Sequence, residues 1–218
     1  MSGSNGNQNG QQPASAQSID LAKKRSDFLL QQLTNAERPA RMVGLFTAKE
    51  MQPHEVERLV DACRRAMREE DQGATLSLEP LGNPSPAELE LQRTWKVTVI
   101  ETADAPPHDC LVQLFAMDDP ASPHHGLLGH LSSMDEEMGR ATRESVQPAK
   151  TYLTVSSGRL DDKNRIHPYE NLVSLFASAL NALIVDPAAA MVTMDPGEWA
   201  DAMEMSLELE GGMKLLRR

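Results

Sequence analysis

Residues 172–192, LVSLFASALNALIVDPAAAMV, form a run of 21 positions with a single charge. The apolar side chains from Leu172 to Leu183 repeat at helical spacing, and polar residues interrupt them on the other side. Pro168 suits the first turn of this helix, and Asp186-Pro187 would end it. A bilayer span needs about 20 uninterrupted apolar residues. The pattern therefore predicts a core helix followed by a core strand, and no membrane span.

The first 37 residues have two different patterns. Residues 1–17 contain mainly Gly, Asn, Gln and Ser, which offer little apolar surface to bury, so we expect a disordered tail. From residue 18 to 37 apolar side chains return at helical spacing and predict an amphipathic helix. That helix would pack on the following domain or contact a partner, and three of its side chains are candidate partner contacts: Ile19, Leu29 and Leu33.

The remaining pattern alternates between the periods of strands and helices. Strands are predicted at 42–46, 75–78, 94–100, 110–117, 151–155 and 188–194, and helices begin near Pro53, Ser133 and Asp195. In the helix that begins near Pro53, apolar side chains from Val56 to Met67 repeat at helical spacing and mark its inward face. Strands 94–100 and 110–117 could pair as an antiparallel hairpin, and the last helix should end near Gly211. We expect one α+β domain over residues 41–210, with a layered ferredoxin-like sheet and amphipathic helices, followed by a C-terminal tail at 211–218.

Charge and composition narrow the class of function. The net charge of -11 and pI near 5.0 disfavour nucleic-acid binding, which needs a concentrated basic surface. Only two cysteines occur, Cys63 and Cys110, so the sequence indicates no disulfide framework. The N-terminus lacks a basic and apolar secretory signal, and we expect a cytoplasmic protein.

Histidines supply the sharpest candidate chemistry. The segment PHHGLLGH contains His124, His125 and His130, and His108 and Cys110 precede it. Their spacing is not that of a helical metal site, and two glycines disfavour a helix between them. They remain weak metal candidates, and the same region is the place for a catalytic site if the protein is a small-molecule enzyme. No Gly-x-Ser-x-Gly or phosphate-binding motif occurs, and we expect no cofactor.

The segment from residue 134 to 203 carries a family resemblance. Its amphipathic helix, the strand AKTYLTVSS, the helix ENLVSLFASALNAL, the strand AAAMVT and the helix start DPGEW follow one another. This order resembles the C-terminal half of the bacterial domain-of-unknown-function family numbered 4261. The resemblance implies an accessory or immunity-type protein near secretion and toxin systems, and it transfers no catalytic residue.

These observations lead to two expectations about function. The first is a non-enzymatic interaction protein whose partner is another protein, basic in charge, with Met203 as a further candidate contact on the Met-rich C-terminal helix. A second copy of the chain is the alternative partner. The second expectation is the small-molecule enzyme with a site near His108, Cys110, His124 and His125.

Overall fold

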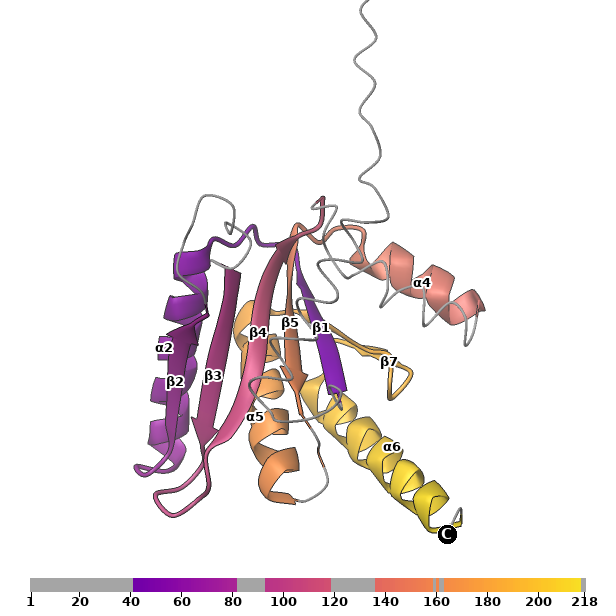
Figure 1. The fold of residues 1–218 in the computed structure, drawn as a ribbon. Helices are drawn as coiled ribbons and strands as arrows, with labels where there is room; N and C mark the ends of the chain where they lie inside the picture. Colours follow the sequence, from indigo (N-terminus) through magenta and orange to yellow (C-terminus); the bar gives the residue numbers. More distant parts are fainter. Residues whose placement is uncertain (1–40, 82–92, 119–135, 159, 161–162, 217–218) are drawn as a thin grey trace, which may run out of the picture.

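The fold is a seven-stranded sheet with helices, an α+β architecture as the sequence predicted (Figure 1). The computed structural model describes residues 41–81, 93–118, 136–158, 160 and 163–216. The strands are β1 (Arg41–Thr47), β2 (Thr75–Pro80), β3 (Thr94–Ile100), β4 (His108–Ala116), β5 (Thr151–Ser157), β6 (Leu183–Asp186) and β7 (Met191–Thr193). The helices are α2 (Pro53–Glu70), α4 (Glu136–Val146), α5 (Lys163–Leu180) and α6 (Pro196–Leu216). None of these helices is both long and apolar enough to cross a bilayer.

All six neighbouring strand pairs of the sheet are antiparallel, in the order β2-β3-β4-β5-β1-β6-β7. The predicted hairpin between β3 and β4 is confirmed, with Val97 opposite Cys110. β1 is the first described strand, yet it lies between β5 and β6, which come more than 100 residues later in the chain. The centre of the sheet therefore depends on pairings between distant segments.

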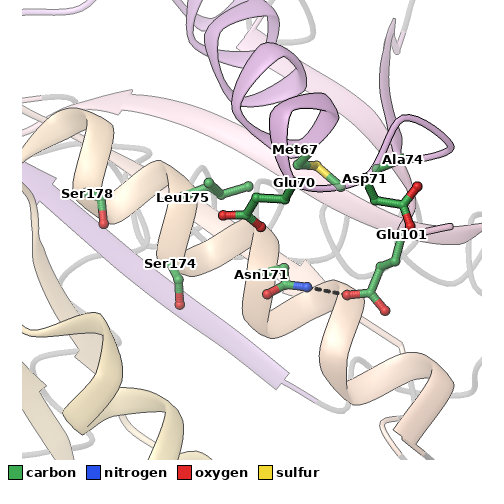
Figure 2. Close-up of a pocket in the computed structure, with 9 residues that line it drawn as sticks. All are labelled: Met67, Glu70, Asp71, Ala74, Glu101, Asn171, Ser174, Leu175 and Ser178. Atoms are coloured by element: carbon green, nitrogen blue, oxygen red, sulfur yellow. Dashed lines mark hydrogen bonds between the residues drawn. The ribbon is translucent and has the colours of Figure 1, made fainter.

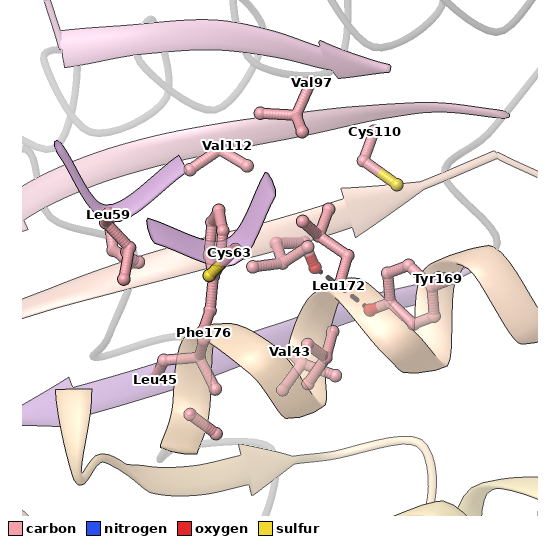
Figure 3. Packing of buried hydrophobic residues seen from close by; sticks show 14 of the residues in the cluster. Val43, Leu45, Leu59, Cys63, Val97, Cys110, Val112, Tyr169, Leu172 and Phe176 are labelled. Carbon is pink, nitrogen blue, oxygen red and sulfur yellow. Dashed lines mark hydrogen bonds between the residues drawn. The ribbon is translucent and has the colours of Figure 1, made fainter. Parts of the chain in front are cut away.

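The main core lies between one face of the sheet and helices α2 and α5 (Figure 3). α2 begins at Pro53 as predicted, and the backbone N–H of Gln52 donates to Glu55 Oε2 at 2.9 Å. Its apolar stripe, which includes Leu59 and Cys63, meets Leu172 and Phe176 of α5 in the same cluster. The helical spacing in the sequence therefore correctly identified the inward faces of both helices.

A smaller apolar cluster lies on the other face of the sheet. The rings of Phe46 and Phe115 stack on either side of Tyr152, with centroid distances of 4.8 and 5.2 Å. Val146, at the end of α4, packs against this cluster with Val185 of β6. Both faces of the sheet centre are therefore buried, which explains why β5 is buried along its whole length.

The boundaries of α5 differ from those predicted. The helix begins at Lys163, so Pro168 lies inside it, and it ends at Leu180 instead of continuing to Asp186. Asn181 adopts a left-handed φ of 47°, and Ala182 N donates to Ala177 O at 2.9 Å. This is a Schellman motif, which ends the helix and frees LIVD to form β6.

The start of α6 was predicted correctly and its end was not. Asp195 Oδ1 accepts from Gly197 N at 2.8 Å and caps the helix before Pro196. The helix then runs to Leu216, through Gly211 and through most of the segment predicted as a tail. A glycine inside a helix costs about 1 kcal/mol relative to alanine, but it does not prevent the helical conformation.

A buried ion pair joins β1, β6 and α6. Arg41 Nη2 and Asp186 Oδ2 are 2.8 Å apart, and their side chains are 1% and 0% exposed. The same Oδ2 accepts from Trp199 Nε1 at 2.9 Å, while Oδ1 accepts from Ala188 N at 3.0 Å. Arg41 Nη1 also donates to Ser206 Oγ at 2.7 Å. One carboxylate thus holds the first described strand, the turn after β6 and the last helix.

Replacing Asp186 with Ala should lower the free energy of unfolding by about 3–5 kcal/mol, because it leaves the Arg41 charge buried without its partner. Urea denaturation followed by circular dichroism measures this change. The matched control is Glu79→Ala, which breaks the Lys96–Glu79 pair, where Glu79 is 62% exposed, and should change stability by less than about 1 kcal/mol. Equal effects of the two substitutions would contradict the structural role of the buried pair.

Candidate functional site

The solvent-facing side of α6 carries large apolar side chains. Met205 and Leu209 are 62% and 64% exposed, and Met194, just before the helix, is 50% exposed. Met205 and Leu209 are four residues apart, and Ala202 precedes Met205 by three, so the three side chains share one face of the helix. Among the described residues, the exposed large hydrophobic side chains are Met194, Met205 and Leu209. We call Ala202, Met205 and Leu209 the apolar stripe of α6.

Packing of the opposite side of α6 explains why this stripe faces solvent. Trp199 and Met203 are fully buried in the main core, and Trp199 contacts the ring of Tyr169 of α5 edge-on at 6.3 Å. Since these residues orient the helix, Met205 points away from the sheet. Figure 1 shows α6 extending past the end of β1.

Carboxylates run beside the apolar stripe. Asp201, Glu204 and Glu208 are offset from the stripe by one residue and are all exposed. Over its whole length α6 contains five acidic residues and one lysine. A cationic, amphipathic partner would therefore meet both apolar contacts and negative charge on this surface.

A second cluster of polar side chains lies between α5 and α6. Its members are His167 and Glu170, three residues apart on α5, and Glu204 of α6, and their donor atoms lie within 4.8 Å of one another. His167 Nδ1 is 3.6 Å from Glu170 Oε2, and that oxygen is buried without a hydrogen-bond partner. Burial raises the pKa of Glu170, and the charge of Glu204 raises it further. This cluster is the one set of described side chains with the composition and spacing of a metal site.

A groove lies between α2 and α5, but it is small for a ligand site (Figure 2). Its volume is about 230 Å³, below the roughly 300–1,000 Å³ typical of sites for small organic ligands. Three carboxylates border it, Glu70, Asp71 and Glu101, and Asn171 Nδ2 donates to Glu101 Oε1. The groove therefore adds negative charge beside α5, and the serines in its lining, Ser174 and Ser178, have no histidine beside them there.

The structure does not support Met203 as a partner contact. Its side chain is 0% exposed, because its spacing from Trp199 places both on the buried side of α6. Met205 and Leu209 lie on the same helix and are exposed, so they are accessible to a partner where Met203 is not. The other predicted contacts, Ile19, Leu29 and Leu33, lie outside the described residues.

Of the histidine and cysteine residues predicted as an enzyme site, the structure describes His108 and Cys110. His108 is 8% exposed, and its Nε2 lies 2.9 Å from Ser157 Oγ, at hydrogen-bond distance. Cys110 is 1% exposed, and burial and then the charge of Asp109 raise its pKa far above the usual value. A buried, protonated thiol is a poor nucleophile. The weak metal candidates His124, His125 and His130 lie outside the described residues.

Sequence reasoning missed the cluster of His167, Glu170 and Glu204. A His-x-x-Glu spacing places both side chains on the same helical face and was a readable signal. Glu204 lies 34 residues after Glu170 along the chain, and only the packing of α6 against α5 brings it near.

Neither cysteine of the folded protein should react with a thiol reagent at pH 8. Burial raises the pKa of Cys63 to about 11 and raises that of Cys110 further, so both thiols stay protonated. Absorbance with Ellman's reagent should show no fast reaction in buffer and two reactive thiols per chain in urea. A fast native reaction that disappears in Cys110→Ala would contradict this expectation and revive the predicted cysteine site.

Glu170→Gln should change how the free energy of unfolding depends on pH, measured with a chelator that keeps metal ions from the cluster. The pKa of Glu170 is higher in the folded than in the unfolded chain, so the folded state binds its proton more tightly. Its contribution to stability is present below the unfolded pKa and is lost as pH rises through the folded pKa. From pH 4.5 upward, the variant should lose less stability than the wild type in urea denaturation. An identical pH dependence would contradict the raised pKa.

The chain matches no protein-family model, no curated protein and no solved structure. The resemblance at residues 134–203 stays a prediction.

Proposed function

We propose that the protein is a non-enzymatic, cytoplasmic accessory protein that binds a basic, amphipathic segment of another protein through α6. The observation that carries this proposal is the apolar stripe, in which Met205 and Leu209 are more than 60% exposed, beside Asp201, Glu204 and Glu208.

Apolar burial would supply the affinity. Full burial of a Met or Leu side chain contributes about 1.5–3 kcal/mol, so these two residues would supply part of the binding free energy, and further contacts with the partner must offset the entropy lost on association. The stripe from Ala202 to Leu209 rises over seven residues, roughly 11 Å, which matches two turns of a partner helix. Met205 adds adaptability, because an unbranched thioether packs against surfaces of different shape.

The carboxylates would supply selectivity. Asp201 and Glu208 are exposed at the edge of the stripe, where charges act mainly on the rate of association and on the choice of partner. The net charge of -11 acts in the same direction over a longer range. Two copies of α6 facing each other would place their carboxylates together, so the charge pattern favours a basic partner over a homo-oligomer built on this surface.

The small-molecule enzyme is the weaker proposal. Its described residues, His108 and Cys110, are buried. The groove beside α5 has a volume of about 230 Å³, and a second hollow of about 440 Å³, bordered by Pro53, Leu114 and Lys150, contains neither His108 nor Cys110 in its lining. Recognition between surfaces requires only exposed groups of the right kind, and α6 has them.

Site-specific photo-cross-linking tests the proposal. A benzophenone amino acid replaces Met205 in the full-length protein, and cross-links are mapped by mass spectrometry after irradiation of cells that normally make the protein. We expect one major product, joined to a segment of another protein that is rich in Lys or Arg and contains apolar residues at helical spacing. The product should decrease when irradiation is done in lysate at raised salt.

Two matched variants make the test specific. The same amino acid at Glu57, which is exposed on the polar side of α2, should give no such product. Replacing both Asp201 and Glu208 with Ser should weaken cross-linking from position 205 without unfolding the chain, since both are exposed. A cross-linked segment that is acidic, or that belongs to a second copy of the chain, would overturn the proposal.

A further inference from the structure

The cluster between α5 and α6 has the donor set of a transition-metal site. His167 offers an imidazole nitrogen, and Glu170 and Glu204 each offer a carboxylate oxygen, all within 4.8 Å of one another. Ligands about 2.1 Å from a tetrahedral zinc ion lie about 3.4 Å apart. The separation of His167 Nδ1 and Glu170 Oε2, 3.6 Å, is close to that value before any side chain moves.

The backbone beneath the cluster is held in place by the core. Tyr169 and Trp199, which make the edge-on contact between α5 and α6, are both 0% exposed. Tyr169 precedes Glu170 directly, and its hydroxyl donates to Val155 O of β5 at 3.0 Å. The Cα atoms of Glu170 and Glu204 are therefore fixed relative to each other, and the two exposed side chains, His167 and Glu204, can rotate toward the half-buried Glu170.

The cluster carries negative charge that its protein neighbours do not neutralise. Glu170 Oε2 is shielded from solvent and has no hydrogen-bond partner, an uncommon and costly state for a carboxylate oxygen. Glu204 and Glu101 both raise the pKa of Glu170, and only His167 opposes them. Within the described part of the chain, no Lys or Arg forms an ion pair with Glu170 or Glu204. A bound cation would satisfy the buried oxygen and remove the repulsion.

We propose that His167, Glu170 and Glu204 bind a divalent transition-metal ion of the Zn²⁺ class, which links α5 to α6. An imidazole nitrogen with two carboxylates suits Zn²⁺ and its neighbours in the first transition series, whereas Mg²⁺ and Ca²⁺ prefer sites made of oxygen alone. His167 is 49% exposed at its side chain, so water can reach the site and complete the coordination. The site borders the apolar stripe of α6, because Glu204 directly precedes Met205, and a bound ion would stiffen the helix that carries the stripe.

Metal binding is tested on the purified full-length protein after treatment with chelator. Isothermal titration with ZnCl₂ should show one site per chain, and Zn²⁺ should raise the melting temperature while Mg²⁺ at the same concentration should not. His167→Ala and Glu170→Gln should each weaken Zn²⁺ binding at least about tenfold. In chelator, Glu170→Gln should melt no lower than the wild type, because it removes a buried carboxylate that lacks a partner.

Two controls separate this site from other sources of binding. Glu208→Gln removes an exposed carboxylate one turn further along α6 and should leave Zn²⁺ affinity unchanged. The triple substitution of His124, His125 and His130 by Ala should also retain the site. No Zn²⁺ binding by the wild type, equal weakening by Glu208→Gln, or full binding by His167→Ala would each overturn the proposal.

Discussion

The buried pair of Arg41 and Asp186 is the interaction on which the arrangement of the C-terminal half depends. Two charges removed from water must satisfy each other and find further hydrogen bonds, or they cost several kcal/mol. Here Asp186 meets this demand with Arg41, Trp199 Nε1 and the turn after β6, and Arg41 reaches Ser206. The result is one position for α6 against the sheet, set by directional bonds as well as by apolar contact.

The fixed position of α6 determines which side chains can act. With Trp199 and Met203 buried, Met205 and Leu209 must face solvent, and Glu204 must lie toward α5. The surface proposed for partner binding and the cluster proposed for metal binding therefore meet on the same helix, where Glu204 of the cluster lies next to Met205 of the stripe. A change that loosens the anchoring of Trp199 would disturb both, even though neither uses that residue directly.

Among the described residues, the thiols and the carboxylates lie in different parts of the fold. The two thiols lie in the core, where burial raises the pKa of each and keeps it protonated, and the His108–Ser157 pair is also buried. Apart from the buried Asp186, exposed carboxylates such as Glu70, Asp201 and Glu208 lie around α5 and α6, where their charge can meet a cation or a basic segment. This division favours recognition over covalent chemistry, because a nucleophile needs both activation and access.

The sequence by itself determined the α+β class, the inward faces of α2 and α5 and the cap of α6, because periodicity and capping depend on neighbouring residues. It misplaced the end of α5, since Asn181 stops that helix in a run whose apolar pattern continues into β6. Only the tertiary structure decided the place of β1 between β5 and β6, the burial of Met203 and the meeting of Glu204 with His167 and Glu170. These outcomes depend on contacts between segments far apart in the chain, which no local pattern encodes.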